Sequence, residues 1–348
     1  MKKKILFICG SVNQTTMMHK ISQNLEAHDL YFTPYYADGF IGFLVKAGFL
    51  KFTILAGKFF ESTVEYLRKN NLQIDYKGKL NDYDLIFTCS DLIVQKNLKG
   101  KKVILVQEGM TDPENFMYYL VKLTGLPRFL ASTSTTGLSG CYDSFCVASE
   151  GYKELFIKKG APADKISVTG IPNFDNCVQY TKNDFPLRDY VLVATSDARE
   201  TFKYENRKKF IQNAIKIAAG RQIIFKLHPN ENVLRATKEI KALIPDAIVY
   251  DKADTNTLIA NCDVLITKFS SVVYVGISLG KEVHSWFNLD ELYKLAPLQN
   301  NGTSAVHIAQ VAEELLQVSS KESELEELEK SSSFKLILKQ INKTLAGV

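Results

Sequence analysis

Short apolar runs recur along this sequence, each followed by turn residues and then by a segment with helical periodicity. Runs this apolar predict parallel strands that helices cover on both faces, because a strand with one face in water alternates with polar residues. Two series of runs occur, one on each side of a polar stretch, and they predict two Rossmann-like, doubly wound α/β domains that face each other across a cleft. The runs are KILFICG (4–10), DLIFTC (84–89), KVILVQEG (102–109), SFCVAS (144–149), KISVTG (165–170), YVLVATS (190–196), QIIFKLHP (222–229), AIVYD (247–251), DVLITKFSS (263–271) and KEVHSWF (281–287).

The polar stretch between the two series, NFDNCVQYTKNDFPLRDY (173–190), contains Pro186 and little periodicity, which is typical of an interdomain linker. We therefore predict a first domain over 1–180, a second domain over 188–320 and a helical tail over 321–348. A chain of 348 residues with 46% apolar and 23% charged residues has the composition of a globular protein with two domains of ordinary size.

Charge and cysteine content narrow the class of protein further. The 43 basic and 38 acidic residues leave a net charge of +5, with no long run of Lys or Arg. Such a balance suits anionic ligands or an anionic membrane, is equally typical of an ordinary solvated surface, and gives no reason to expect nucleic-acid binding. The six cysteines have no CxxC pair and no metal-ligand spacing, which indicates a cytoplasmic protein. The apolar start MKKKILFICGS is too short for a signal peptide and predicts a first strand followed by a turn.

One stretch, FIGFLVKAGFLKFTILAGKFF (40–60), is long and apolar enough to suggest a membrane span. Its three lysines and three glycines argue against one. At 100° per residue, the main apolar side chains share one arc and the lysines fall outside it, which predicts an amphipathic helix. Such a helix would lie on an anionic membrane, bind a lipid-linked acceptor, or pack as an ordinary core helix. The arc consists of Leu44, Val45, Phe49, Phe52, Leu55 and Phe59.

Four segments of the second half place phosphate-binding groups at predicted strand ends. In the first, VLVATSDARE, Thr195 and Ser196 end a strand and Arg199 follows. Hydroxyls and backbone N–H groups at such a turn bind phosphate oxygens, and an arginine adds a two-pronged donor. The same residue types are also ordinary helix N-caps, so this segment alone predicts little.

The second segment, FKLHPNEN (225–232), puts His228 directly after a predicted strand. An imidazole at this position can donate to a phosphate oxygen and stabilise charge on a departing nucleotide. Pro229 fixes the following turn and removes one backbone donor. Asn230 and Glu231 are placed to reach the ribose or the base. A purely structural role for this histidine is the competing interpretation.

The third and fourth segments place helix starts at the same sheet edge. In YDKADTNTLIANCDVLIT, Asp254 or Thr255 caps a helix that has Thr257 in its first turn. In LITKFSSVVYVGISLGKEV, Ser270 and Ser271 open a helix, so hydroxyls and helix-end N–H groups converge on one spot, which is typical of an anion site. The sequence has no Gly-rich phosphate loop, zinc spacing or GxSxG motif, so we expect phosphate binding without a metal or a cofactor.

The first half supplies candidates for the acceptor side. The run VILVQEG places Glu108 directly after a strand, and Asp112 follows closely. A carboxylate at this strand end, across the cleft from the phosphate-binding segments, can deprotonate an acceptor hydroxyl. We favour Glu108 over Asp112, which has the alternative role of a surface charge near a helix start. Gly10, Ser11 and Asn13 follow the first strand and border the same cleft.

These motifs resemble those of glycosyltransferases with the GT-B fold, in which two Rossmann-like domains face each other across a cleft. The likeness is to the branch that uses cytidine-activated donors, such as bacterial sialyltransferases, Kdo transferases and CDP-glycerol glycerophosphotransferases. In that branch a His-Pro motif contacts the donor and a Ser-Ser motif binds its phosphate, and here His228-Pro229 and Ser270-Ser271 match them. The segment 148–175 also resembles the one that precedes the interdomain linker in this fold. The resemblance implies that the second domain binds the nucleotide donor and the first binds the acceptor.

Two departures from the family pattern bear on the substrate. Glycerophosphotransferases commonly have Asp-Tyr before the paired serines, where this chain has Lys268-Phe269, and QEG stands in place of their amino-terminal His-Gly motif. Both departures favour a sugar transferase with a carboxylate base. We therefore predict an inverting, metal-independent glycosyltransferase that moves a sugar from a nucleotide-activated donor, preferably CMP-linked, to a bacterial surface glycan or a lipid-linked acceptor.

Three alternatives stay open. The chain also resembles non-hydrolysing UDP-N-acetylglucosamine 2-epimerases, whose His-Arg-x-x-Asn-type motif HPNEN matches in part. A CDP-glycerol glycerophosphotransferase is the second alternative, and a catalytically silent nucleotide-sugar-binding or scaffold protein is the third. The expected partners are thus a nucleotide-sugar and a glycan or lipid-linked acceptor. Contact of 40–60 with the membrane would bring the protein to its inner face.

Overall fold

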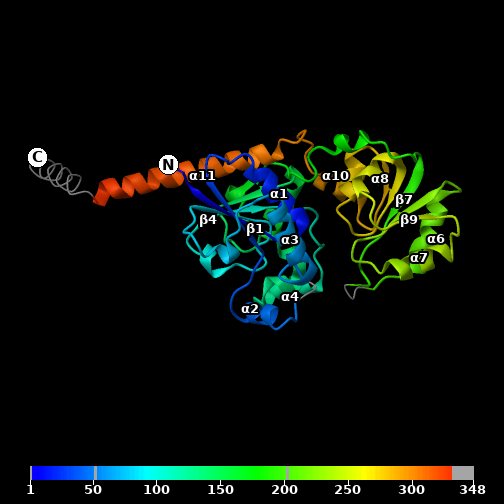
Figure 1. Ribbon diagram of the computed structural model, residues 1–348, viewed down its shortest axis with the longest axis horizontal. Helices are drawn as coiled ribbons and strands as arrows, with labels where there is room; N and C mark the ends of the chain where they lie inside the picture. Colours follow the sequence, from blue (N-terminus) through cyan, green and yellow to red (C-terminus); the bar gives the residue numbers. More distant parts are fainter. Residues whose placement is uncertain (1, 51–52, 201–203, 331–348) are drawn as a thin grey trace, which may run out of the picture.

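The computed structural model describes residues 2–50, 53–200 and 204–330. Figure 1 shows two α/β domains, each built on one sheet, with a long helix, α11 (Ser304–Lys330), lying along the first domain. Both sheets consist of parallel strands only. The predicted fold class, two doubly wound parallel-sheet domains, is confirmed.

The first domain contains a six-stranded sheet in the order β2-β1-β3-β4-β5-β6. Its central strands are buried on both faces, because successive side chains of a strand point to opposite sides. Leu6 and Ile8 of β1 enter one core cluster, and Ile5, Phe7 and Cys9 enter the other. The strands are β1 (Lys4–Cys9), β2 (Asp29–Pro34), β3 (Leu85–Thr88), β4 (Lys102–Val106), β5 (Ser144–Val147) and β6 (Ile166–Val168). The helices are α1 (Val12–Ser22), α2 (Gly39–Lys46), α3 (Gly57–Lys69), α4 (Phe116–Thr124) and α5 (Glu150–Lys159), with short 3-10 helices at Tyr76–Gly78, Lys96–Leu98, Arg128–Thr135 and Ala163–Lys165.

The second domain contains a five-stranded sheet in the order β11-β10-β7-β8-β9. Leu192 of β7 points into the core cluster that continues into the first domain, and Val191 and Val193 point to the opposite face. The strands are β7 (Tyr190–Ala194), β8 (Ile223–Lys226), β9 (Ile248–Tyr250), β10 (Cys262–Ile266) and β11 (Glu282–His284). The helices are α6 (Arg207–Ala218), α7 (Val233–Lys241), α8 (Thr255–Asn261), α9 (Val273–Ser278) and α10 (Leu289–Leu295), and a 3-10 helix at Cys177–Thr181 lies in the linker.

Each of the ten apolar runs contains an observed strand, but the sequence did not indicate β2. This strand pairs with β1 from Asp29 to Pro34 and forms an edge of the sheet. The first half of β2 is only partly buried, because an edge strand has one neighbour instead of two. Its apolar run consists only of Leu30, Tyr31 and Phe32, which is shorter than the run of β1.

The single amphipathic helix predicted over 40–60 is wrong. The chain forms α2 and then a separate helix, α3, which begins at Gly57. Gly48 and Gly57 both have positive φ, at 82° and 62°, a conformation that interrupts a helix. Phe52 of the predicted arc lies outside the described residues. Within the described ranges, no helix combines the length and apolarity that crossing a bilayer would require.

Helix α11 returns from the second domain to the first. Ala305, Ile308 and Ala312 belong to the same core cluster as the residues on one face of β1. The N–H of Ser304 donates to Asp175 Oδ2 at 2.8 Å, which fixes the start of the helix. The chain therefore crosses between the domains twice. The predicted boundaries stay predictions, and the part of the tail after residue 330 lies outside the described residues.

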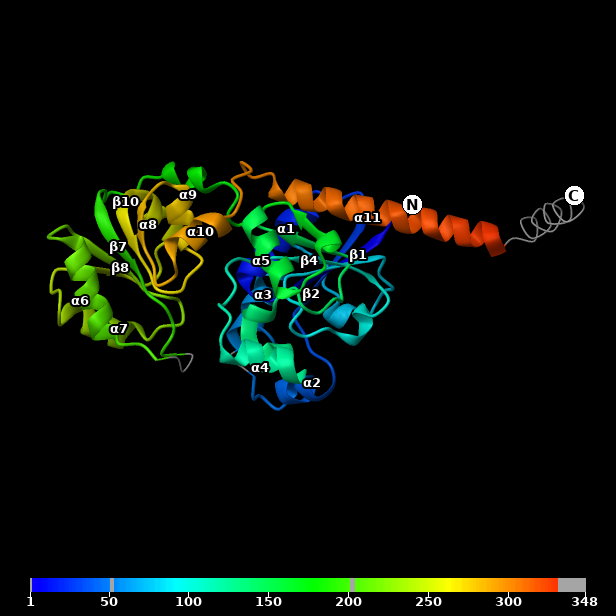
Figure 2. The ribbon, with the colours of Figure 1, turned by 180° about the vertical axis from the view of Figure 1, so that it is seen from behind.

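The domains meet through buried polar contacts at the base of the cleft. The hydroxyl of Tyr152 on α5 lies 2.7 Å from the hydroxyl of Tyr274 on α9, and both side chains are buried. Burial raises the pKa of Tyr274 to about 12. Ser149 Oγ also donates to the carbonyl of Leu295 at 3.2 Å. Figure 2 shows α10 beside α5 at this junction.

Candidate active site

Three of the predicted donor segments follow neighbouring strands of the second sheet. Strand β7 lies between β10 and β8, and the carboxyl ends of parallel strands share one edge of the sheet. Thr195 and Ser196 follow β7, His228 follows β8, and Ser270 and Ser271 follow β10. The strand order therefore places two hydroxyl pairs and one imidazole along a single edge.

His228 is held at the end of β8 by its backbone and by one ring nitrogen. Its N–H donates to Thr195 Oγ1 at 3.1 Å and to Glu231 Oε2 at 3.0 Å. Nδ1 accepts a hydrogen bond from the N–H of Asn230 at 3.2 Å, so the neutral ring carries its proton on Nε2. Asp197 Oδ2 lies 3.7 Å from Nδ1. The side chain is partly exposed, so the Nε2–H group can donate to a ligand.

A buried ionic cluster supports the same strand end. Glu231 has a completely buried carboxylate that accepts hydrogen bonds from Thr195 Oγ1 and from Arg207 Nη2. Arg207 is itself buried, and its Nε lies 2.8 Å from Oε1 of the buried Glu205. The structure thus differs from the expectation that Glu231 reaches the ribose or base and that Thr195 faces a phosphate. Both side chains point inward and hold the loop that carries His228.

Two further predicted donor residues, Arg199 and Ser196, bind carboxylates of the protein. Both terminal nitrogens of Arg199 donate to Glu239, each at 2.8 Å. These hydrogen bonds hold the pKa of Glu239 below its ordinary value. Ser196 Oγ donates to Glu205 Oε2 at 3.2 Å. A phosphate would have to compete with these carboxylates, and the phosphate roles of Arg199 and Ser196 stay predictions.

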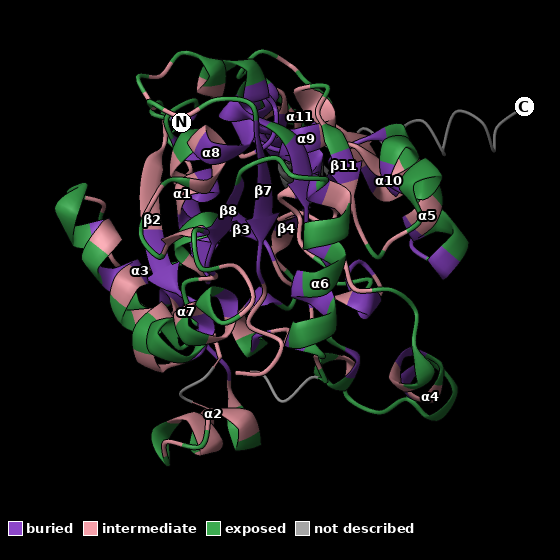
Figure 3. Cartoon of the chain, turned by 90° about the vertical axis from the view of Figure 1, so that its right-hand side faces the viewer, coloured by how far each residue is buried: buried purple, intermediate pink, exposed green. Residues whose placement is uncertain are grey.

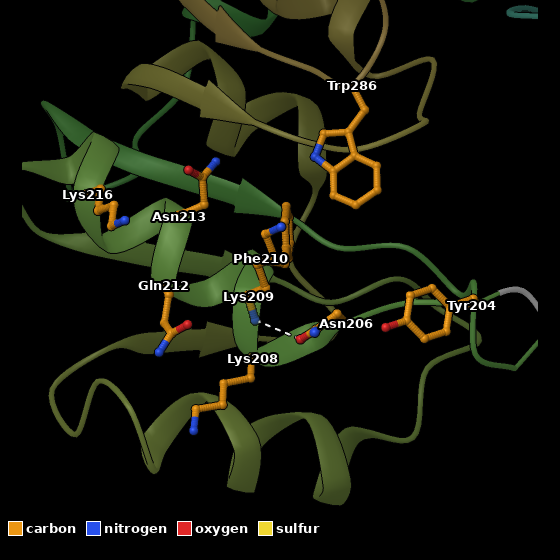
Figure 4. Close-up of a pocket in the computed structure, with 9 residues that line it drawn as sticks. All are labelled: Tyr204, Asn206, Lys208, Lys209, Phe210, Gln212, Asn213, Lys216 and Trp286. Atoms are coloured by element: carbon orange, nitrogen blue, oxygen red, sulfur yellow. Dashed lines mark hydrogen bonds between the residues drawn. The ribbon is translucent and has the colours of Figure 1, made fainter.

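Lys268, which precedes the paired serines, is buried under Trp286. Its Nζ lies 3.9 Å from the centre of the indole ring and 3.7 Å from Glu205 Oε2. Burial lowers the pKa of Lys268, and the nearby Glu205 carboxylate opposes this shift. Trp286 also borders a hollow of about 860 Å³ beside α6, which Figure 4 shows together with the exposed ring of Tyr204. The described walls of this hollow include none of the site residues predicted from the sequence.

Ser271 faces the first domain. A methyl group on Gly109, just after β4, would contact Cβ of Ser271 at 3.7 Å, so the two segments lie close together across the cleft. Ser271 and Glu108 both line an interdomain pocket of about 350 Å³. Ser270 Oγ lies 3.5 Å from the N–H of Val272 at the same helix start. The pocket thus combines a hydroxyl from the second domain with a carboxylate from the first.

Glu108 is held by three side chains at the start of α1. Ser11 Oγ at 3.3 Å and Asn13 Nδ2 at 3.2 Å donate to Oε1, and Gln14 Nε2 donates to Oε2. Gly10 leaves room for this arrangement, because a Cβ there would lie 2.0 Å from Gln14 Oε1. A carboxylate has about four acceptor sites, so one remains for a substrate hydroxyl.

Most of the predicted residues lie outside the described lining of this pocket, which includes Asn13, Glu108 and Ser271 and does not include His228 or Ser270. Asp112 accepts a hydrogen bond from Thr133 Oγ1 at 2.9 Å and donates its N–H to the same oxygen at 2.8 Å. Thr257 Oγ1 donates to Asp254 Oδ2 at 2.6 Å at the start of α8. Neither Asp112 nor Thr257 lines the interdomain pocket.

Sequence reasoning missed Gln14, Glu205 and Arg207. The spacing Ser11-x-x-Gln14 is a capping-box pattern, which signals a helix start and gives no hint of a contact with Glu108. Glu205 lies just before α6 and Arg207 is the first residue of that helix, in a mainly polar stretch whose pattern does not indicate burial. Their role depends on the fold of the loop after β7.

Comparison with known proteins gives similarity in structure alone. No protein-family model matches this sequence, and no curated protein matches it significantly. The UDP-GlcNAc 2-epimerase from Neisseria meningitidis, solved with bound UDP-GlcNAc, matches with a TM-score of 0.56 and 13% identity, over 89% of this chain and 100% of that one. The UDP-N-acetylglucosamine 2-epimerase from Rickettsia bellii matches with a TM-score of 0.52 and 12% identity, over 96% and 100%.

A third similar structure, the wall teichoic acid polymerase TagF, has 12% identity over 91% of this chain and 90% of that one. Its TM-score is 0.49. Structural similarity at identities this low shows a common fold and does not identify the substrate. With its two parallel-sheet domains and these structural neighbours among nucleotide-sugar enzymes, the chain has the GT-B fold.

Proposed function

We propose that this chain is an inverting, metal-independent glycosyltransferase that takes a sugar from a nucleotide donor, with a CMP-linked donor favoured. The proposed acceptor is a bacterial surface glycan or a lipid-linked precursor. Such an acceptor would bring the enzyme to the inner face of the membrane, with residues 40–60 in contact with it.

The observation that carries the proposal is the pairing of Glu108 with Ser271 in one interdomain pocket. Glu108 is oriented by three donors at the acceptor side, and Ser271 stands at the start of α9 on the donor side. A sugar held between them would have a base on one side and phosphate-binding groups on the other.

The proposed reaction is a direct displacement. The acceptor hydroxyl gives its proton to Glu108 while its oxygen bonds to the anomeric carbon of the donor, and the bond from that carbon to the phosphate oxygen breaks. The negative charge that develops on the departing phosphate is stabilised by the Nε2–H of His228 and by the hydroxyls of Ser270 and Ser271. Attack from the face opposite the leaving group inverts the anomeric centre.

The direct test is transfer of a labelled sugar from CMP-linked donors to a panel of surface oligosaccharides and lipid-linked acceptors. Glu108→Gln keeps the size of the side chain and removes the base, so turnover should fall by about 10²–10⁴-fold. Glu114→Gln is the matched control, because Glu114 is exposed and its carboxylate accepts from Tyr119 outside the pocket. Equal turnover in both variants would contradict the role of Glu108.

A UDP-N-acetylglucosamine 2-epimerase is the second candidate, because both structural neighbours with TM-scores above 0.5 described above carry that activity in their names. Epimerisation removes a proton from one face of the sugar and returns it from the other, which calls for acid–base groups on both faces. Glu108 is the one carboxylate among the described residues that line the pocket, which favours transfer. Epimerised product from UDP-N-acetylglucosamine without any acceptor would decide for the epimerase.

The choice of nucleotide can be measured without knowing the sugar. A thermal-shift panel of CMP, CDP, UDP, GDP and ADP should show the preferred nucleotide stabilising the protein by about 2.7 kcal/mol at a hundredfold excess over its dissociation constant. Strongest stabilisation by CMP supports the proposed donor. A preference for CDP would favour a glycerophosphotransferase, and a preference for UDP would favour the epimerase. Nucleotide binding with no donor consumption would indicate a catalytically silent binding protein.

A further inference from the structure

Helix α2 is apolar, yet none of its residues is buried. Phe40 is 73% exposed and Phe43 is 62% exposed, and Phe49 is exposed just after the helix. Ile41 and Val45, on the other side of the helix, rest against the core of the domain. Figure 3 shows α2 in the colours of exposed and partly buried residues at one end of the molecule. A concentration of exposed phenylalanine on a soluble domain marks a surface that binds something apolar.

Helix α4 exposes a second apolar set at the same end of the first domain in Figures 1 and 2, and Figure 3 shows α2 and α4 apart from each other along this end. Phe116 is 77% exposed and Leu123 is 86% exposed, with Tyr119 exposed between them. A hollow of about 470 Å³, lined by Ile41 of α2 and by residues 125–129 after α4, lies between the two helices. We name the combined surface the apolar end; it comprises Phe40, Phe43, Phe49, Phe116, Tyr119 and Leu123.

The charge around the apolar end is mainly positive. Residues 38–60 and 114–136 contain five basic residues and two acidic residues, Asp38 and Glu114. Lys46 in the last turn of α2 and Lys122 in α4 are both exposed. A second copy of this chain would bring like charges together, which disfavours self-association through this surface. An anionic lipid surface complements both the charge and the exposed aromatic and leucine side chains.

We propose that the apolar end docks on an anionic phospholipid bilayer, with the aromatic and leucine side chains of α2 and α4 inserted at the headgroup level and the lysines paired with lipid phosphates. The inference concerns lipid binding only, so it holds whether or not the chain transfers a sugar.

The position of the apolar end fits the interdomain pocket. Leu92 lines both the hollow between α2 and α4 and the pocket that contains Glu108. Ile54, from the same segment as α2, also lines the pocket. A bilayer held at the apolar end would therefore lie next to the entrance through which a lipid-linked acceptor reaches Glu108.

The test is co-sedimentation of the full chain with vesicles of pure phosphatidylcholine and with vesicles that also contain phosphatidylglycerol. We expect binding to the anionic vesicles that weakens as salt is added. Phe40→Ser plus Phe43→Ser, and separately Phe116→Ser plus Leu123→Ser, should each weaken partitioning by about ten- to a hundredfold. Leu234→Ser is the matched control, because Leu234 is 84% exposed on α7 of the second domain, and it should bind like the parent.

A second pair of changes separates charge from insertion. Lys46→Gln plus Lys122→Gln should weaken binding to the anionic vesicles by about tenfold or more and leave binding to phosphatidylcholine unchanged. All of these side chains are exposed, so circular dichroism should match the parent, and the melting temperature should change little because Lys122 loses only its hydrogen bond to the carbonyl of Lys159. The proposal is overturned if the parent does not sediment with anionic vesicles, if Leu234→Ser loses as much binding as the paired variants, or if the paired variants turn a dimer into a monomer with lipid binding unchanged.

Discussion

The buried ionic cluster of the second domain can be tested with Arg207→Met. Methionine keeps much of the length of the arginine stem, but it removes the guanidinium that donates to Glu231 and lies 2.8 Å from Glu205. Both carboxylates are buried, so each would lose a cationic partner in a site with little water. Breaking a buried ion pair from one side costs about 3–5 kcal/mol. Because Thr195 and the N–H of His228 still bind Glu231, we expect the lower end of this range, about 3 kcal/mol.

The assay uses the fluorescence of Trp286, the single tryptophan of the chain, during unfolding in urea. Trp286 lies over Lys268, which pairs with Glu205, so its signal reports on the second domain and not on the first. Free energies of unfolding fall by about 1–3 kcal/mol for each molar increase in urea. A loss of about 3 kcal/mol should therefore lower the midpoint by about 1–3 M.

The control is Arg235→Met, which breaks the ion pair of Arg235 with Glu200. Arg235 has a side chain that is 43% exposed, and a pair of this kind contributes about 0–1 kcal/mol. Adding Glu231→Leu to Arg207→Met removes one of the unpaired charges and should recover part of the loss. If Arg207→Met and Arg235→Met have the same midpoint, the cluster is not a buried ionic network and the reasoning fails.

Three further outcomes test the site and the domain contact. His228→Ala should lower turnover by about 10²-fold or more, measured by donor consumption, and a change of only a few-fold would contradict its phosphate role. Gly10→Ala should push the Gln14 amide away from Glu108 and lower turnover by about ten- to a hundredfold while the thermal shift with nucleotide stays the same; unchanged turnover would refute the alignment. The raised pKa of Tyr274 means that its buried hydroxyl keeps a proton that the unfolded chain loses near pH 10, so the urea midpoint should fall between pH 10 and about 12. Tyr274→Phe should reduce this fall, and a midpoint independent of pH in the parent would contradict the prediction.

Most strands of this fold could be predicted from the sequence, because a strand that is buried on both faces has a continuous apolar run, as in ILFIC of β1. Strand β2 has only Leu30, Tyr31 and Phe32 before Thr33 and Pro34, a shorter run than that of β1. The prediction of a single helix over 40–60 was wrong because two glycines with positive φ interrupt the helix there. The periodicity of apolar residues does not reveal such an interruption.

Part of the candidate site could also be predicted from the positions of the strands. A residue that follows a parallel strand must lie at the carboxyl edge of the sheet, so the sequence placed Glu108, His228 and Ser271 at sheet edges. The sequence did not indicate the direction in which each side chain points, because this direction depends on packing. Glu231, in the loop after β8, turns inward to Arg207, which begins α6. The approach of Ser271 to Gly109 depends on how the two domains meet, and no local pattern encodes this arrangement.

Helix α11 has a consequence for the order in which a nascent chain can fold. A ribosome releases the amino end first, at about 5–20 residues per second, yet the first sheet depends on Ile308, Ala312 and Leu316, which are made after the whole second domain. Until they emerge, the apolar side of α1, including Met17 and Ile21, has no cover from α11. The later-made domain can therefore complete its core before the earlier-made one, and the half-finished first domain is the species that a chaperone would meet.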